Sequence, residues 1–162
     1  MRIRPTTREE WERVRDLRLR SLSDAPDAFG STLEREGGLG ESGWIDWIEG
    51  WEGATNAMFV AERGEDWIGM AVGSRTGEEA DGHLYGMWVD PSWRKQGIGA
   101  RLVEAVIGWA RSWGAGTLIL GVTEFNDGAA GFYERLGFAD TGERYPLREQ
   151  SPLVCRVLRR PL

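Results

Sequence analysis

The chain of 162 residues has little cysteine, no excess of positive charge and no long hydrophobic run. Its one cysteine, Cys155, has no partner for an internal disulfide, so we expect a reducing compartment, the cytoplasm. The formal net charge of −6 argues against broad nucleic-acid binding, which needs a basic face. No apolar run reaches the length of a membrane span, so we expect neither a transmembrane helix nor a signal peptide. Nucleic acid and membrane are therefore not expected partners, and no metal site is predicted.

The composition is that of a globular chain. Hydrophobic residues make up 41%, with nine tryptophans and five phenylalanines, and the length predicts a single domain over residues 1–162. Alternating strand and helix patterns predict an α/β fold, a mixed sheet flanked by helices. The expected strands are 2–4, 58–62, 67–73, 83–89, 117–122, 138–144 and 153–158. A first helix is expected after Thr6 or Thr7, and three more over 42–51, 97–113 and 126–136. The segment 24–40 is expected to be a loop.

A strand that runs into a glycine-rich turn and then a helix is the most informative local feature. His83 to Val89 is rich in aromatic and branched residues, and Pro91 ends it. Gly97 and Gly99 follow, two residues apart, at the start of the next helix. The free N–H groups of a helix start attract an anion, and glycines let it approach the backbone. The turn is therefore predicted to bind a phosphate or pyrophosphate, with Arg94 and Lys95 adding positive charge, although such side chains are often only solvated.

Two motifs narrow the identity of the phosphate ligand. The dinucleotide fingerprint fails because Leu102 stands where its third glycine belongs, and the Walker Gly-Lys-Ser/Thr is absent. What is present is Arg94-x-x-Gly97-x-Gly99, followed downstream by Asn126-x-x-Ala-x-x-Phe-Tyr133-x-x-x-Gly-Phe138. Together, from His83 to Phe138, these resemble the GNAT family of N-acetyltransferases, and the segment 27–34 resembles a loop of its bacterial members.

The resemblance implies a fold, a cosubstrate and a set of binding residues. The fold would be a mixed, mostly antiparallel sheet of about six to seven strands flanked by about four helices. Acetyl-CoA would lie along the strand before the turn, with its pantetheine arm paired to backbone groups of Met87 and Val89. An N–H near Met87 would polarise the thioester carbonyl. The pyrophosphate would contact Arg94, Lys95, Gln96, Gly97, Ile98, Gly99 and Ala100.

Tyr133 matches the tyrosine that meets the coenzyme sulfur in the family. A phenol, with an ordinary pKa of about 10, is protonated at neutral pH and can donate to the leaving thiolate. Asn126 lies about two turns earlier on the same helix face and is expected to reach the same cofactor arm. The plain alternatives are a packed amphipathic tyrosine and a helix-capping asparagine.

The general base is left open by the sequence. Many relatives use a glutamate at the position where this chain has His83, its only histidine. An imidazole can accept a proton, but a lone histidine beside an acidic turn can equally be a solvated surface residue. Glu124 is a second candidate, and relatives also pass the proton through water to a distant carboxylate.

The acceptor is expected in a cleft formed by the first third of the chain. Its candidate walls are Phe29, the tryptophans Trp44, Trp47 and Trp51, and Tyr145 within the segment 140–146, although the tryptophans also fit a stripe packed on the sheet. Glu34, Glu36, Asp46 and Glu49 are candidates for attracting an ammonium group.

The implied activity is direct transfer of acetyl from acetyl-CoA to an amine of a small molecule or a peptide N-terminus, by a monomer or homodimer. The alternatives are a non-catalytic acyl-CoA-binding regulator and a scaffold that binds another nucleotide.

Overall fold

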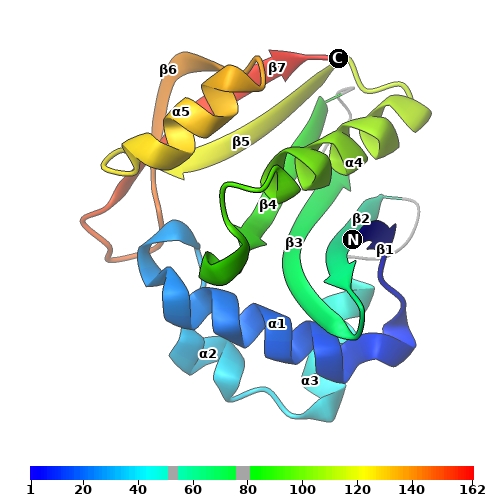
Figure 1. Ribbon diagram of the computed structural model, residues 1–162. Coiled ribbons are helices and arrows are strands. Elements are labelled where there is room, and N and C mark those ends of the chain that lie inside the picture. The colour runs from blue at the N-terminus through cyan, green and yellow to red at the C-terminus, as the bar shows by residue number, and fades with distance from the viewer. Residues whose placement is uncertain (51–54, 76–80) are drawn as a thin grey trace.

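Seven strands form one sheet in the computed structural model, which describes residues 1–50, 55–75 and 81–162 (Figure 1). Their order is β1-β2-β3-β4-β5-β7-β6. The β4–β5 pair is parallel and every other pair is antiparallel, which confirms the predicted mixed, mostly antiparallel sheet. The strands are β1 (Arg2–Pro5), β2 (Asn56–Arg63), β3 (Asp66–Arg75), β4 (Asp81–Val89), β5 (Thr117–Thr123), β6 (Ala139–Pro146) and β7 (Val154–Pro161).

Helices cover both faces of this sheet (Figure 1). The α-helices are α1 (Trp11–Asp24), α2 (Leu33–Gly37), α3 (Glu41–Glu49), α4 (Ile98–Ser112) and α5 (Asp127–Arg135). Short 3-10 helices η1 (Arg8–Glu10), η2 (Pro26–Ala28) and η3 (Pro91–Trp93) lie between them.

Two hydrophobic cores, one on each face, hold the helices to the sheet. On one face the apolar stripe of α4, including Leu102 and Val106, packs with α5 residues such as Ala130 and with Leu118 of β5. On the other, Val14 and Leu17 of α1 and Ile48 of α3 pack on the inner strands.

The strands separate between β4 and β5. Their parallel pairing covers only three register positions, 81–83 against 117–119, and the strands diverge beyond them. Just past the last pair, β4 contains a β-bulge in which Gly86 and Met87 together oppose Ala71 of β3. Gly86 has a φ of +58°, a left-handed conformation that glycine adopts without strain. The bulge re-aims the β4 backbone beside the opening.

The segment 24–40 differs from the prediction of a loop. It contains η2 and α2, and the Thr32 side chain caps α2 by accepting a hydrogen bond from the Arg35 N–H at 3.2 Å. The glycines and Pro26 mask this short helix in the sequence, and a tertiary ion pair through Glu36 helps to fix it. The helix expected over 42–51 is observed as Glu41–Glu49, and Trp51 lies outside the described residues.

Candidate active site

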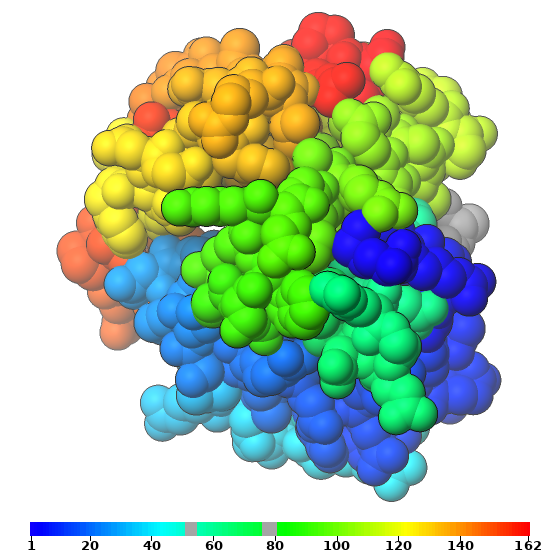
Figure 2. Space-filling view, in the orientation of Figure 1, coloured from blue at the N-terminus to red at the C-terminus, as the bar shows by residue number. Residues whose placement is uncertain are grey.

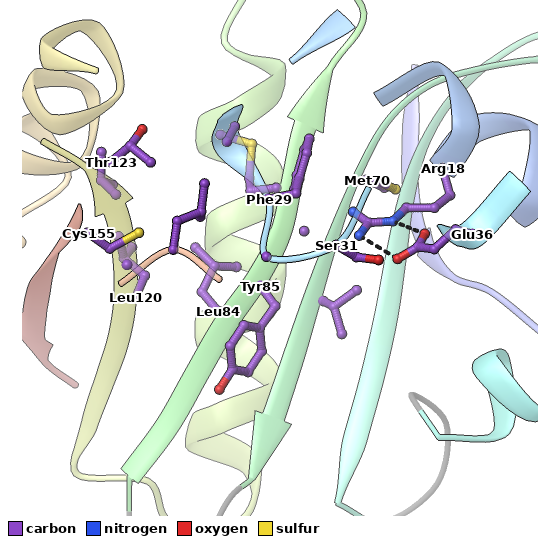
Figure 3. A pocket seen from close by; sticks show the side chains of 18 of the residues that line it. Arg18, Phe29, Ser31, Glu36, Met70, Leu84, Tyr85, Leu120, Thr123 and Cys155 are labelled. Carbon is purple, nitrogen blue, oxygen red and sulfur yellow. Dashed lines mark hydrogen bonds and ion pairs between the residues drawn. The ribbon is translucent and has the colours of Figure 1, made fainter. Parts of the chain in front are cut away.

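A cleft of about 790 Å³ occupies the opening between β4 and β5. Its lining on one side includes Asn126, Ala129 and Tyr133 around α5, and on the other it includes Arg18 of α1 and Glu36 of α2. In Figure 3, Leu120, Thr123 and Cys155 lie on one side, and the Arg18–Glu36 pair lies on the other. The cleft therefore connects the α5 face of the sheet with the α1–α2 face.

Tyr133 is buried in the wall of this cleft. Its side chain is 7% exposed and its ring packs edge-on against Phe132 and Phe138. No described residue forms a hydrogen bond with its hydroxyl. Burial raises the pKa of Tyr133 well above its ordinary value, so the phenol stays protonated. The geometry leaves one O–H donor for a ligand in the cleft.

The turn before α4 forms a nest of backbone N–H groups. Lys95 and Gly97 both have left-handed backbones, with φ of 61° and 77°, and Gly97 is the N-cap of α4. None of the backbone N–H groups of residues 95–100 donates a hydrogen bond to a described residue, so these groups are available to an anion. The surface is hollowed between this turn, in green, and the yellow surface around residues 120–127 (Figure 2). Such a nest suits a phosphate group.

Arg94 is exposed beside this turn and is also paired within the protein. Its side chain is 46% exposed. Its Nε donates to the Val89 carbonyl at 2.9 Å, and its Nη2 pairs with the Asp24 carboxylate, which also accepts from Trp88. The charge of Arg94 is therefore partly balanced by Asp24. Arg94 thereby ties β4 and its turn to the end of α1.

Gly99 has a packing role as well as a place in the turn. A Cβ on it would lie 3.1 Å from the Phe132 ring and 3.4 Å from Met87 Cε. Gly97, by contrast, has no atom near its missing Cβ and is required for its backbone conformation.

The other residues predicted to bind the cofactor have different surroundings. Met87 lines the cleft, whereas Val89 and Ile98 are core residues, Gln96 is exposed and Ala100 is half-buried.

Asn126 caps α5 and also lines the cleft. Its Oδ1 accepts a hydrogen bond from the Ala129 N–H at 3.1 Å, as an N-cap residue does. Both interpretations of this residue are therefore compatible with its position.

The two candidate bases lie away from the described cleft lining. His83 pairs with Ser74 and Ile119 in the sheet and stacks on Tyr85 at 5.9 Å between ring centroids. Burial lowers the pKa of His83, against a smaller opposing effect of Asp81. The Glu124 carboxylate binds Arg144 at 2.6 Å. Neither residue is among those that line the cleft.

The predicted acceptor residues have different surroundings in the structure. Phe29, Trp47, Asp46 and Tyr145 line the cleft. Trp44 is buried in the α3 stripe at 1% exposure, which favours the packing interpretation. The carboxylates of Glu36 and Glu49 are bound by Arg18 and Arg8, so neither is free to attract an ammonium group as expected, and Glu34 is exposed.

Tyr145 and Cys155 meet across β6 and β7. The Tyr145 hydroxyl lies against Gly121, where any Cβ would overlap it. Burial, with the neighbouring Cys155, raises the pKa of Tyr145 to about 12. Burial likewise raises the pKa of Cys155, a buried free thiol in the cleft wall.

Sequence analysis missed Arg18 and the bulge at Gly86. Arg18 stands in an amphipathic helix among several arginines, and nothing in its spacing distinguishes it. Within residues 1–50, 55–75 and 81–162, no helix is long and apolar enough to cross a membrane, and no group of three or more His, Cys, Asp or Glu side chains is placed to hold a metal ion.

Comparison with known proteins gives consistent matches. N-acetyltransferase 8B of Homo sapiens is 29% identical over 143 residues, 85% of this chain and 54% of its own length. The mycothiol acetyltransferase of Thermobispora bispora is 30% identical over 127 residues, 75% of this chain and 40% of its own. The chain thus spans about half, or less, of the length of these curated relatives.

Solved structures show the same fold. The ribosomal-protein-alanine N-acetyltransferase of Brucella melitensis superposes with a TM-score of 0.81 at 20% identity, over 100% of both chains. The yncA protein of Salmonella typhimurium, solved with its cofactor acetyl-CoA, gives a TM-score of 0.80 at 16% identity, over 100% of this chain and 94% of its own.

A family profile decides the assignment. Residues 11–138 match the profile described as the acetyltransferase (GNAT) family, a span that includes the turn before α4, Tyr133 and most of the residues that line the cleft. Because this match covers well over half of the chain, the chain belongs to the acetyltransferase (GNAT) family.

Proposed function

We propose that the chain transfers an acetyl group from acetyl-CoA to an amine. The observation that carries this proposal is the Tyr133 hydroxyl: the residue lines the cleft, and its hydroxyl has no hydrogen-bond partner among the described residues. A proton donor at this position can protonate the thiolate of coenzyme A as that thiolate leaves. The family membership and a relative crystallised with acetyl-CoA support the choice of cosubstrate.

The residues present fit acetyl-CoA at both ends. The N–H nest at residues 95–100 suits the pyrophosphate, and the unpaired stretches of β4 and β5 offer backbone groups to the pantetheine arm. Met87, beside the bulge, supplies the N–H assigned to the thioester carbonyl. The cosubstrate supplies an activated acetyl thioester, and the chain positions it.

The proposed reaction removes two protons from the acceptor nitrogen and adds one to sulfur. The ammonium first loses a proton to His83 or Glu124, or through water to Asp46, the described lining carboxylate that forms no ion pair with a described residue. The neutral amine then forms a bond to the acetyl carbon, the C–S bond breaks, and Tyr133 gives its proton to the departing sulfur. The nitrogen loses its second proton to solvent as the amide forms, and the Tyr133 phenolate regains a proton from solvent.

Two glycine variants of the α4 region test the cofactor site. Gly97→Ala places a Cβ on a residue with a left-handed backbone, which is strained. Because the backbone must move to relieve this strain, the nest of N–H groups is distorted. We therefore expect coenzyme A affinity to fall about tenfold or more. Gly108→Ala makes the same change on the same helix, where no atom lies within 4 Å, and affinity should be unchanged. Calorimetric titration with coenzyme A measures both, with circular dichroism as the check on folding.

Release of free thiol from acetyl-CoA across a panel of amines measures turnover. Thiol release that depends on an amine is the expected result. Binding of coenzyme A without thiol release for any amine would instead support a non-catalytic acyl-CoA-binding regulator. The absence of any heat with coenzyme A would reject the cosubstrate itself.

A further inference from the structure

Arg18 is the buried cation of the cleft. It is 7% exposed, and its Nε and Nη2 donate to the two carboxylate oxygens of Glu36 at 2.7 and 3.0 Å (Figure 3). The carbon of its guanidinium lies 4.8 Å from the centroid of the Phe29 ring and 5.8 Å from that of Trp47. Two oxygens and two rings therefore fix the orientation of this group.

The opposite edge of the guanidinium has no partner. An arginine has five N–H donors, and Glu36 accepts two of them, which leaves both donors of Nη1 and one of Nη2. No described residue accepts from Nη1. Nη1 lies 4.0 Å from the place where a Cβ of Gly86 would be, so it faces the bulge. Arg18 lines the cleft, so an oxygen of a ligand in the cleft can accept from these free donors.

A carboxylate matches this edge in both shape and charge. Its two oxygens can accept the remaining Nη1 and Nη2 donors side by side, the bidentate geometry that arginine favours. Glu36 already balances the charge of Arg18, so a ligand with a single negative charge is better tolerated here than a dianion such as phosphate. The charged side chains of the described lining, Arg18, Arg35, Glu36 and Asp46, sum to zero, which suits a zwitterion.

We infer that the acceptor is an amino acid, or a similar small amine with a carboxylate within a few bonds of its nitrogen, and that Arg18 binds this carboxylate. The inference rests on the proposed acetyl transfer. Nη1 lies beside Gly86, and the next residue, Met87, is the one assigned to the thioester carbonyl, so carboxylate and amine must be close together. A peptide N-terminus, whose neighbouring group is an amide, would leave the Arg18 donors without a charged partner.

Matched acceptors test this inference on the wild-type protein. Each of a set of amino acids is compared with its amide and its decarboxylated amine, at equal concentrations of the neutral amine, because the three differ in amine pKa. We expect kcat/KM for the acids to exceed that for the matched amides and amines by about 10- to 100-fold.

The variant Arg18→Lys tests the residue itself. It keeps the charge and loses the second donor edge, so the preference for the acid should fall toward unity while coenzyme A affinity, measured by calorimetry, is retained. A folded variant that keeps the full preference would overturn the role of Arg18. If the variant does not fold, the wild-type comparison decides the inference alone.

The outcomes separate this inference from the proposed function. Equal turnover of acids, amides and plain amines by the wild type would overturn the inference and leave acetyl transfer in place. Thiol release with none of the amines, despite coenzyme A binding, would reject the proposed function and the inference with it.

Discussion

Tyr133 has both a packing role, through its ring, and a proposed chemical role, through its hydroxyl. Its ring has ordinary packing partners in Phe132 and Phe138, so the plain interpretation of a packed tyrosine holds for the ring. The hydroxyl is what that interpretation leaves unexplained, since it has no described partner and belongs to a residue that lines the cleft.

Tyr133→Phe is therefore expected to separate chemistry from stability. The variant keeps the ring contacts and removes an unpaired donor, so the free energy of unfolding should be unchanged or slightly higher. If Tyr133 is the general acid, kcat should fall about 100-fold or more, with coenzyme A affinity nearly unchanged. Stopped thiol-release assays and calorimetry give the two values, and an unaltered kcat would remove Tyr133 from the acid role.

The pH dependence follows from the same burial. Burial raises the pKa of Tyr133, and the protonated form is the active one, so its loss shifts to higher pH than for an ordinary phenol of about 10. Between pH 7 and 10, kcat/KM of the wild type should show no decline due to this group. A decline in that range that disappears in Tyr133→Phe would contradict the assignment.

At the scale of elements, α4 and β3 are held together by a close approach. A Cβ on Gly73 of β3 would lie 2.7 and 2.8 Å from atoms of the Trp109 ring and 3.0 Å from Val106, both on α4. The absence of a side chain at Gly73 thus sets the height at which α4 sits on the sheet, and with it the position of the turn that opens α4.

We expect Gly73→Ala to destabilise the fold by about 1–3 kcal/mol, because overpacking must move α4 or β3. Gly108→Ala, on the exposed side of the same helix, should stabilise it by about 0.5–1 kcal/mol through helix propensity. Urea unfolding of the two variants measures the difference. Equal stability of Gly73→Ala and wild type would show that α4 shifts freely on the sheet.

At the scale of the whole molecule, one sheet is shared by two cores but is weakly joined in its middle. The strands β1 to β4 form one half and β5 to β7 the other, and only three register positions pair β4 with β5. A ligand in the cleft would contact both halves and replace the missing strand pairing.

Coenzyme A is accordingly expected to stabilise the molecule as a unit. At a free concentration 100 times its Kd, a ligand that binds only the folded state adds about 2.7 kcal/mol to the free energy of unfolding. Amide hydrogen exchange should slow in β4, β5 and the turn before α4, with β1 and β2 less affected. ATP or NAD at the same concentration should have no such effect, and an equal effect would favour a scaffold for another nucleotide.

Much of the local structure was predictable from sequence because its causes are local. The strand–turn–helix from His83 to Trp113 is set by branched residues, two glycines and a helical apolar stripe. The left-handed Gly137 after α5 and the cap by Asn126 depend on neighbouring residues alone. The short α2 was missed because its glycine-rich surroundings suggest a loop and its anchor is remote.

The sequence by itself determined the order of the strands and longer helices, the family and the residues of the two motifs, since each of these depends on spacing along the chain. Only the tertiary structure decided that Arg94 faces Asp24, 70 residues away, and that Arg18 meets Glu36 at the α1–α2 side of the cleft. It also decided how far β4 and β5 part. An arginine can pair with any of several carboxylates of the chain. Packing and distance in the folded chain determine which of them it contacts.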